Sequence, residues 1–515
     1  MPGAAATACR RPCSGAALRF TEVPPAVHFE TLGCKLNQIE SESAARYFSD
    51  AGFTVDMEPA TAADAPGAAV LCVVNTCTVT GKAEQKARRV IRLLLRKYEN
   101  AAVLVTGCYA ELDAPQLAAI DGRVCVLPGS LKDTLADIPA RFRSFIAADV
   151  TASECAAFLR RAVAAEKSAG GAVYTPTFRL ATDTFFTHSR ASIKIQDGCN
   201  NACTYCRIHL ARGKAVSLDA ASVLERVRSI EARNQHEVVL TGVNLSQYRG
   251  SFGSFFLDIA GLLRFLLDNT ERIRFRLSSL YPERVDDALC EVIAHERIMP
   301  HFHLSVQSGS DRILTLMRRP YTSADVAAAV ERLRAVKRNP FIACDIIAGF
   351  PGESDDDFGQ TMELCRSCRF AWIHAFPFSP RPGTPAYAMK PVVPQSTAAH
   401  RVRRLTEFAI ASKCAYISSY KGTVVSAITE QNRKDRKAAF ETTAADDAGG
   451  ARTVRSPVTH AVTSNFIHVE LPGSFAPGSR IAVRITDALP EHIRNGDECE
   501  ASAEPVYDEK SVTDL

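Results

Sequence analysis

Three apolar stretches near the start of the chain each end in a cysteine. They read AVHFETLGC, AAVLCVVNTC and AAVLVTGC, and they end at Cys34, Cys77 and Cys108. Near-continuous runs rich in valine and alanine are typical of parallel strands that are buried on both faces. A helical pattern follows each run, beginning NQIESESAARYF, GKAEQKARRVIRLLL and YAELDAPQLAAI. This alternation predicts a doubly wound parallel α/β domain over residues 27–150.

The position of the three cysteines predicts a shared site. Ligands of open α/β sheets bind just outside the carboxyl ends of the strands. Because three strands in a row deliver a cysteine to that end, we expect Cys34, Cys77 and Cys108 to converge in one crevice. The alternative is three core cysteines placed there by chance, and the threefold recurrence favours the site.

A second alternation of strands and helices begins at residue 189. Six strand patterns can be counted: ASIKIQDGC, EVVLTGVN, IRFRLSSL, HFHLSVQSG, FIACDIIAGFPG and WIHAFPFSP. Eight βα units typically take about 250 residues, which is more than this region offers. Six units predict an open, partial (βα)6 barrel over residues 189–415.

The pattern changes again after about residue 420. Short alternating strands such as GTVVSAITE, FIHVELPG and SRIAVRI are separated by glycine, proline, asparagine and aspartate. This is typical of a small β-barrel, which we expect over residues 416–490. The remaining parts are expected to be an unstructured extension (1–26), a linker that starts as a helix (151–188) and a tail (491–515).

A group of three cysteines follows the first strand of the predicted barrel. In IKIQDGCNNACTYCRIHLARG, Cys199, Cys203 and Cys206 stand close together without a fourth cysteine. A structural zinc ion takes four ligands, whereas three thiolates can hold three irons of a four-iron cluster and leave the fourth iron open for a substrate. The spacing therefore favours an iron–sulfur cluster with an open iron. Zinc is the alternative, with His209 as the candidate fourth ligand.

Composition supports metal chemistry over disulfides. The chain has 17 cysteines, but its first residues lack the apolar core of a secretory signal, and no apolar run is long enough to cross a membrane. We therefore expect a cytoplasmic protein without a membrane partner. Structural disulfides are rare in that reducing compartment, so metal binding or catalysis explains clustered cysteines better.

The motif C-x-x-x-C-x-x-C at the end of the first strand of a six-unit barrel resembles the radical S-adenosylmethionine enzymes. The added three-cysteine domain and the C-terminal β-module resemble the methylthiotransferases among them, from about residue 27 to about 490. The resemblance implies two four-iron clusters and S-adenosylmethionine as cofactors. It implies that Cys199, Cys203 and Cys206 hold the cluster that binds S-adenosylmethionine, and that Cys34, Cys77 and Cys108 hold an auxiliary cluster. No catalytic residue beyond these ligands is expected.

The same resemblance suggests further cofactor-binding residues. Tyr205 resembles an aromatic residue that lies near the adenine. Gln307 and Ser308, in SVQSGS, end the fourth strand at the same mouth of the barrel, and Asp345 lies in CDIIAGFPGES. His209 stands where relatives often have proline, so the turn of the cluster loop is expected to differ.

Four motifs resemble the methylthiotransferases that act on threonylcarbamoyladenosine in tRNA: LGCKLNQIESE, NTCTVT, VVLTGVNLSQY and HLSVQSGS. The implied activity is transfer of a methylthio group to C2 of this nucleoside, at position 37 beside the anticodon. The implied partners are tRNA, an electron donor and a sulfur donor. Two other classes of the family act on isopentenyladenosine in tRNA and on a ribosomal protein aspartate. A non-enzymatic iron–sulfur or zinc protein that binds RNA is the alternative of another kind, but it leaves the six-strand barrel without a role.

Basic residues suggest where RNA would bind. The formal net charge is only +4, so local runs must indicate the surface. The β-module resembles the RNA-binding TRAM module, and lysine and arginine clusters supply much of the affinity for phosphates. The candidates share a helix face or a short run, and they are Arg88, Arg92 and Arg96; Arg433, Lys434, Arg436 and Lys437; and Arg401, Arg403 and Arg404.

Overall fold

The computed structural model describes residues 24–63, 67–147, 150–169, 178–182, 190–430 and 457–507. The chain divides into two compact units. The first comprises residues up to Leu32, Ala44–Thr76 and Glu84–Val173. The second comprises Gly33–Ser43, Cys77–Ala83 and everything from Tyr174 onward.

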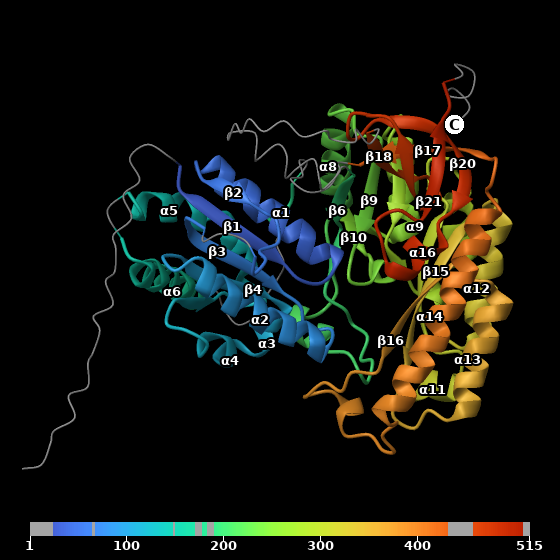
Figure 1. The fold of residues 1–515 in the computed structure, drawn as a ribbon, viewed down its shortest axis with the longest axis horizontal. Coiled ribbons are helices and arrows are strands. Elements are labelled where there is room, and N and C mark those ends of the chain that lie inside the picture. Colours follow the sequence, from blue (N-terminus) through green and yellow to red (C-terminus); the bar gives the residue numbers. More distant parts are fainter. Residues whose placement is uncertain are drawn as a thin grey trace, which may run out of the picture. The chain divides into compact units, whose positions relative to one another are not determined.

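The first unit is built on a five-stranded sheet with the order β2-β1-β3-β4-β5. All four strand pairs are parallel, which confirms the predicted parallel α/β fold. Figure 1 shows these strands side by side in blue. Their bounds are β1 Ala26–Thr31, β2 Thr54–Asp56, β3 Ala69–Thr76, β4 Ala102–Gly107 and β5 Val124–Val126. Every residue of β3 and β4 is buried, as their unbroken apolar runs require.

Helices connect these strands. They are α1 Lys35–Asp50, α2 Gly81–Lys97, α3 Cys108–Leu112, α4 Ala114–Ala118, η1 Gly129–Ala136, α5 Ile138–Phe145 and α6 Ala152–Ala169. In α2 the buried residues Ala87, Ile91, Leu94 and Leu95 recur every three or four positions, which is the helical period of the sequence pattern. Helix α6 takes up the first half of the predicted linker.

The second unit contains the six predicted parallel strands in chain order. They form two sheets, β6-β9-β12 and β13-β14-β15-β16. Their bounds are β6 Ala191–Lys194, β9 Glu237–Thr241, β12 Arg274–Leu277, β13 Ser279–Leu280, β14 His301–Gln307, β15 Phe341–Ala348 and β16 Trp372–Pro377. The third predicted strand, IRFRLSSL, breaks at Ser278, so β12 pairs with β9 while β13 pairs with β14. Within the described residues β6 and β16 do not pair, which confirms an open, partial barrel.

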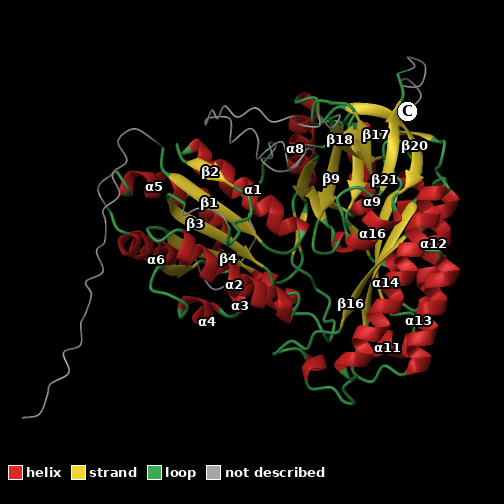
Figure 2. Ribbon diagram, in the orientation of Figure 1, coloured by secondary structure: helices red, strands yellow, loops and turns green. Residues whose placement is uncertain are grey.

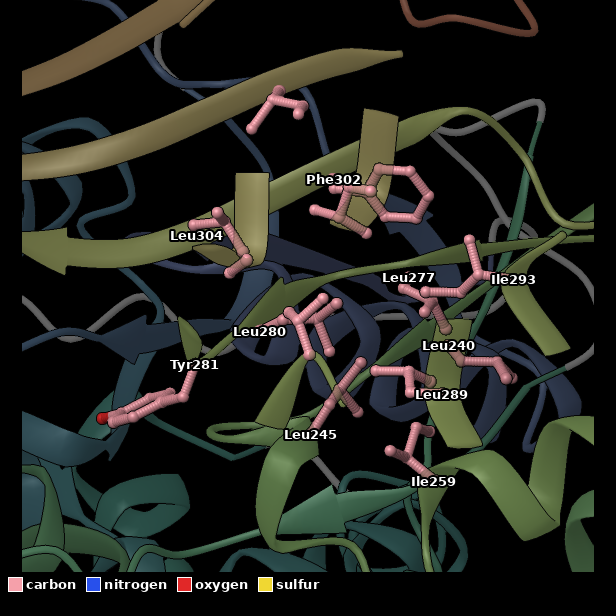
Figure 3. Packing of buried hydrophobic residues seen from close by; sticks show 14 of the residues in the cluster. Leu240, Leu245, Ile259, Leu277, Leu280, Tyr281, Leu289, Ile293, Phe302 and Leu304 are labelled. Carbon is pink, nitrogen blue, oxygen red and sulfur yellow. The ribbon is translucent and has the colours of Figure 1, made fainter. Parts of the chain in front are cut away.

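Helices link successive strands of this barrel, and apolar side chains from both fill the space between them. The helices are α8 Ala220–Ala232, α9 Ile259–Asp268, α10 Asp287–Ile293, α11 Asp311–Leu316, α12 Ser323–Val336, α13 Asp355–Cys368 and α14 Gln395–Ser418. Capping boxes start α12 at Thr322 and α13 at Ser354. Figure 3 shows strand residues Leu240 and Leu277 close to Leu289 of α10, and Phe302 and Ile259 belong to the same hydrophobic cluster.

The C-terminal β-barrel is closed, with the order β17-β18-β19-β21-β20. Its strands, yellow in Figure 2, are β17 Val424–Thr429, β18 Val458–Thr463, β19 His468–Pro472, β20 Arg480–Ala488 and β21 Ala501–Pro505. The predicted small barrel is therefore confirmed, but its strands continue past the expected end at residue 490. Strand β21 reads only ASAEP, and its inward residues Ala501 and Ala503 are too small to give an apolar pattern.

No helix in the described part of the chain is long and apolar enough to cross a membrane.

Candidate functional site

The loop that carries Cys199, Cys203 and Cys206 runs from the carboxyl end of the first barrel strand. It follows β6 and the short strand β7 (Gln196–Asp197) and ends at α7 (Ile208–Arg212). Cys203 is buried, while Cys199 and Cys206 are partly exposed. An α/β barrel places its reactive groups in loops at this end of its strands.

Each of the three sulfur atoms accepts a hydrogen bond from the protein. The backbone N–H of Asn201 donates to Sγ of Cys199 at 3.4 Å, and that of Ile208 donates to Sγ of Cys206 at 3.4 Å. Burial raises the pKa of the Cys199 thiol, and it raises the pKa of Cys206 to about 12. Deprotonation of such a thiol therefore needs a strong positive partner, which a bound metal supplies.

Glycine is required directly before Cys199. Gly198 has a φ of +69°, and a Cβ atom there would lie 2.0 Å from the carbonyl oxygen of Lys214. The same approach lets the N–H of Cys199 donate to the carbonyl of Gly213 at 3.1 Å. Gly198 thus allows the two ends of the cysteine loop to meet.

The sulfur of Cys203 accepts a hydrogen bond from Arg319, a residue that the sequence did not indicate. Its Nη1 donates to Sγ of Cys203 at 3.3 Å, and its Nη2 donates to the carbonyl of Ser305 at 2.8 Å. The guanidinium group lies over the rings of Tyr281 and Tyr321, with distances to the ring centres of 4.3 and 4.9 Å. This contact places a positive charge directly against the Cys203 sulfur. An arginine in LMRRPYT has no spacing that could reveal this contact.

The predicted cofactor-binding residues occupy different surroundings. The ring of Tyr205 lies edge-on to Phe350, with 6.4 Å between ring centres, so it faces the turn after β15. Gln307 ends β14 with a φ of +71°, a strained value for a residue with a side chain and one often found at functional sites. Ser308 is buried, and its hydroxyl lies 3.3 Å from that of Thr361 on α13.

Asp345 contacts a histidine, His303, on the neighbouring strand β14. Its Oδ2 lies 3.0 Å from Nε2 of His303 on β14, and the His303 ring stacks on His374 of β16 at 5.2 Å. Burial and the neighbouring His303 lower the pKa of His374 to about 4. Asp345 stands in the middle of β15 rather than at its carboxyl end.

The three N-terminal cysteines follow β1, β3 and β4, which are adjacent in the sheet. A Cβ atom on Gly33, whose φ is +112°, would lie 2.6 Å from Cβ of Cys77, so glycine allows the loops of Cys34 and Cys77 to meet. Cys34 is exposed, Cys77 is buried, and Cys108 is the buried first residue of α3. Their convergence on one cluster stays a prediction.

Arg381 lies beside Cys77. Its side chain is buried, and its Nη2 donates to the hydroxyl of Thr78 at 3.1 Å. The sequence did not indicate this residue either, because it follows β16 and is about three hundred positions from its partner.

A buried charge network connects the start of α1 with the first barrel strand. Nζ of Lys194 lies 2.9 Å from the Glu40 carboxylate and 3.2 Å from that of Asp197. Nη1 of Arg212 lies 3.0 Å from Glu40 and 2.9 Å from Asp197, and its Nη2 donates to Oδ1 of Asn37 at 2.7 Å. All four charged side chains are at most 5% exposed. The network ties the helix after Cys34 to both ends of the Cys199–Cys206 loop.

The chain has clear relatives. Residues 193–365 match the family described as the radical SAM superfamily, and residues 26–129 match "Uncharacterized protein family UPF0004". It is 46% identical to "Threonylcarbamoyladenosine tRNA methylthiotransferase MtaB" of Treponema pallidum, over 79% of this chain and 91% of that protein. The chain belongs to the radical S-adenosylmethionine methylthiotransferase family.

Of two further relatives of this methylthiotransferase, one carries the same name as the Treponema protein and the other carries a different one. The protein of the same MtaB name from Thermotoga maritima is 34% identical, over 74% of this chain and 81% of that protein. A "tRNA-2-methylthio-N(6)-dimethylallyladenosine synthase" from Alkalilimnicola ehrlichii is 32% identical, over 91% of this chain and 96% of that protein.

The cofactors of this methylthiotransferase are four-iron clusters and S-adenosylmethionine. The donor set at Cys199, Cys203 and Cys206 fits such a cluster, because iron–sulfur clusters are held by cysteine thiolates. The zinc alternative would need His209 to join the cysteines on one ion. Among the described residues, no group of three or more His, Cys, Asp or Glu side chains is placed to hold a single metal ion. Cluster ligands differ in this respect, since each binds a separate iron.

The three basic runs predicted to bind RNA differ in how exposed their side chains are. Arg92 and Arg96 of α2 are exposed, whereas Arg88 donates to the hydroxyl of Tyr109 and is partly buried. Arg401 is buried and paired with Glu353 and with Asp355, so its proposed place in an RNA-binding run was wrong. The run of Arg433, Lys434, Arg436 and Lys437 lies outside the described residues.

Proposed function

We propose that this chain transfers a methylthio group to C2 of the threonylcarbamoyladenosine beside the anticodon of tRNA. The observation that carries the proposal is the three-cysteine loop at the carboxyl end of β6 in an open parallel barrel. The 46% identity to a protein named for this reaction supports the choice of substrate.

We assign Cys199, Cys203 and Cys206 as ligands of the cluster that binds S-adenosylmethionine. When present, this cluster would supply the electron for the reductive cleavage of S-adenosylmethionine. Arg319 positions the Cys203 sulfur and screens its charge. Tyr205 and Gln307 are proposed to border S-adenosylmethionine, Tyr205 with its ring and Gln307 from the end of β14. Ser308, hydrogen-bonded to Thr361, and Asp345, paired with His303, are proposed to support this side of the barrel.

We assign Cys34, Cys77 and Cys108 as ligands of a second cluster, and one variant tests this assignment. Changing Cys77 to alanine is expected to remove about half of the bound iron and to block thiolation, while cleavage of S-adenosylmethionine continues. Iron analysis, deoxyadenosine release and the methylthio product are measured on the same preparation.

Cys72 provides the matched control for this experiment. It lies on the same strand, β3, and is fully buried, but the proposal gives it no metal. Cys72→Ala should keep both clusters and both activities. A Cys77→Ala protein with its full iron content would place the second cluster elsewhere.

The substrate is tested by mass spectrometry of tRNA nucleosides from cells with and without the gene. Loss of the methylthio group from threonylcarbamoyladenosine alone, restored by the wild-type gene and not by Cys199→Ala, is expected. Loss from isopentenyladenosine instead would move the chain to the class of its dimethylallyladenosine relatives. If neither nucleoside changes, the tRNA proposal fails and the ribosomal protein aspartate becomes the candidate.

The reaction needs an electron donor and a sulfur donor, and both are proposed as separate partners of unknown identity. We also propose that the protein acts in the cytoplasm, where its tRNA substrate is found.

A further inference from the structure

A cavity of about 790 Å³ lies at the amino ends of the barrel strands. His236 and Arg274 reach it from the starts of β9 and β12, and Lys337 lines it from the end of α12. Ser464 and Arg480 line it from the C-terminal β-barrel. Within the parallel sheet β6-β9-β12, Cys199 follows a carboxyl end, so this basal pocket opens at the opposite end of the strands from the cluster loop.

The basal pocket carries an excess of positive charge. Six of its side chains are cationic, namely Arg272, Arg274, Arg297, Lys337, Arg338 and Arg480. Its carboxylates are Glu231, Glu271 and Glu296. Glu231 is already engaged, since it accepts hydrogen bonds from three successive backbone N–H groups at 3.2, 2.7 and 2.9 Å. Within the residues that the structure describes, none of the six cations lies in an ion pair with a carboxylate. Arg297 donates instead to the hydroxyl of Thr270 at 2.9 Å, and Lys337 to the carbonyl oxygen of His295 at 2.8 Å.

Two of these cations are held close together by one hydroxyl group. Nη1 of Arg274 donates to Oγ of Ser426 at 3.1 Å, and Nε of Arg480 donates to the same oxygen at 3.2 Å. Burial and the neighbouring Arg480 lower the pKa of Arg274 to about 10. Burial also lowers the pKa of Lys337 to about 8. Unpaired cations crowded in this way favour an anion that bonds to both guanidinium groups.

The size and spread of the charges favour a backbone with several phosphates over a single small anion. The cations come from the start of β12, from the loops before β12, β14 and β15, and from β20 of the C-terminal β-barrel. The five residues of β9 span about 17 Å at roughly 3.3 Å per residue, and the pocket and the cluster loop lie beyond opposite ends of this sheet, so a group bound in the pocket is remote from the cluster loop. A nucleotide undergoing modification cannot occupy both ends of the barrel.

We propose that the basal pocket binds backbone phosphates of the tRNA at a distance from the nucleotide being modified. The inference rests on the proposed function and extends it. Full-length tRNA gains contacts here that an isolated anticodon stem–loop does not reach. The basal pocket therefore binds the body of the tRNA, while the carboxyl end of the barrel binds the anticodon loop.

The test compares both RNAs on the cluster-loaded enzyme and on the variant Arg272→Gln/Arg338→Gln/Arg480→Gln. The Kd for full-length tRNA is expected to rise at least about tenfold, and the slope of log K against log salt is expected to fall by about 0.9 for each phosphate that the variant no longer neutralises. The Kd for the stem–loop and its rate of methylthiolation should stay at wild-type values.

The control variant Arg264→Gln/Arg332→Gln/Arg366→Gln removes the same charge from exposed positions outside the pocket. It should leave both Kd values close to wild type. If the triple pocket variant melts early, Arg272→Gln/Arg338→Gln is used, since both side chains are exposed.

Three outcomes would overturn the inference: an unchanged Kd for full-length tRNA, an equal loss of affinity for the stem–loop, or an equal loss of affinity in the control variant. Failure of the proposed function would be seen separately, as a wild-type enzyme that does not methylthiolate the stem–loop.

Discussion

Changing Cys203 to alanine is expected to abolish the reductive cleavage of S-adenosylmethionine. Cys203 is the buried member of the three-cysteine loop, and its sulfur is held by Arg319 at 3.3 Å. With only two thiolates left, the loop cannot hold three irons, and the buried arginine loses its sulfur acceptor. Deoxyadenosine release by anaerobically reconstituted protein should fall to the level seen without enzyme, while the cluster at Cys34, Cys77 and Cys108 is retained.

The control for this experiment is Cys344→Ala, at a buried cysteine in the core of the same barrel. It removes a thiol of similar burial from β15 and is expected to cleave S-adenosylmethionine normally. Normal cleavage by Cys203→Ala would contradict the assignment of the loop. Loss of activity in both variants would point to damage of the barrel and not of the site.

Changing Glu40 to glutamine is expected to destabilise the protein by about 3–5 kcal/mol, because it removes one partner of a buried ion network. Glu40 is 2% exposed and accepts from both Lys194 and Arg212, whose positive charges would then lose this carboxylate while keeping that of Asp197. The free energy of unfolding is measured by denaturant titration near pH 7. Since Arg212 follows the Cys199–Cys206 loop and pairs with Asp197 in front of it, the variant should also lose iron more readily during purification.

An exposed pair on the same helix gives the matched control. Nε of Arg46 lies 2.9 Å from Oδ1 of Asp50, and both side chains are about half exposed. Asp50→Asn is expected to cost at most about 1 kcal/mol, because water screens the pair. Similar losses of stability in Glu40→Gln and Asp50→Asn would show that the network adds nothing beyond ordinary surface electrostatics.

The position of Glu40 illustrates where sequence patterns stop being informative. NQIESES reads as the polar start of a surface helix, yet Asn37, Glu40, Glu42 and Ser43 are all buried. A polar residue is buried when partners from elsewhere in the chain satisfy it, and Lys194 and Arg212 lie more than 150 positions away. Periodicity cannot reveal such partners.

The arginines of α14 show that a run of basic residues in the sequence does not reveal which of them are exposed. Arg401, Arg403 and Arg404 form one basic run in the sequence, but Arg401 is paired and buried while Arg403 and Arg404 are exposed. A helix turns neighbouring residues to different faces, and only the packing of α14 decides which face meets Glu353.

The sequence by itself determined the parallel strands, the open six-strand barrel, the small β-barrel and the two sets of three cysteines. These depend on local apolar runs and short spacings, which are written along the chain. Only the tertiary structure revealed the break between β12 and β13, the contact of Arg319 with Cys203, the network around Glu40 and the basal pocket. Each of these joins residues far apart in the chain, and their energy comes from burial and from charges that meet only after folding.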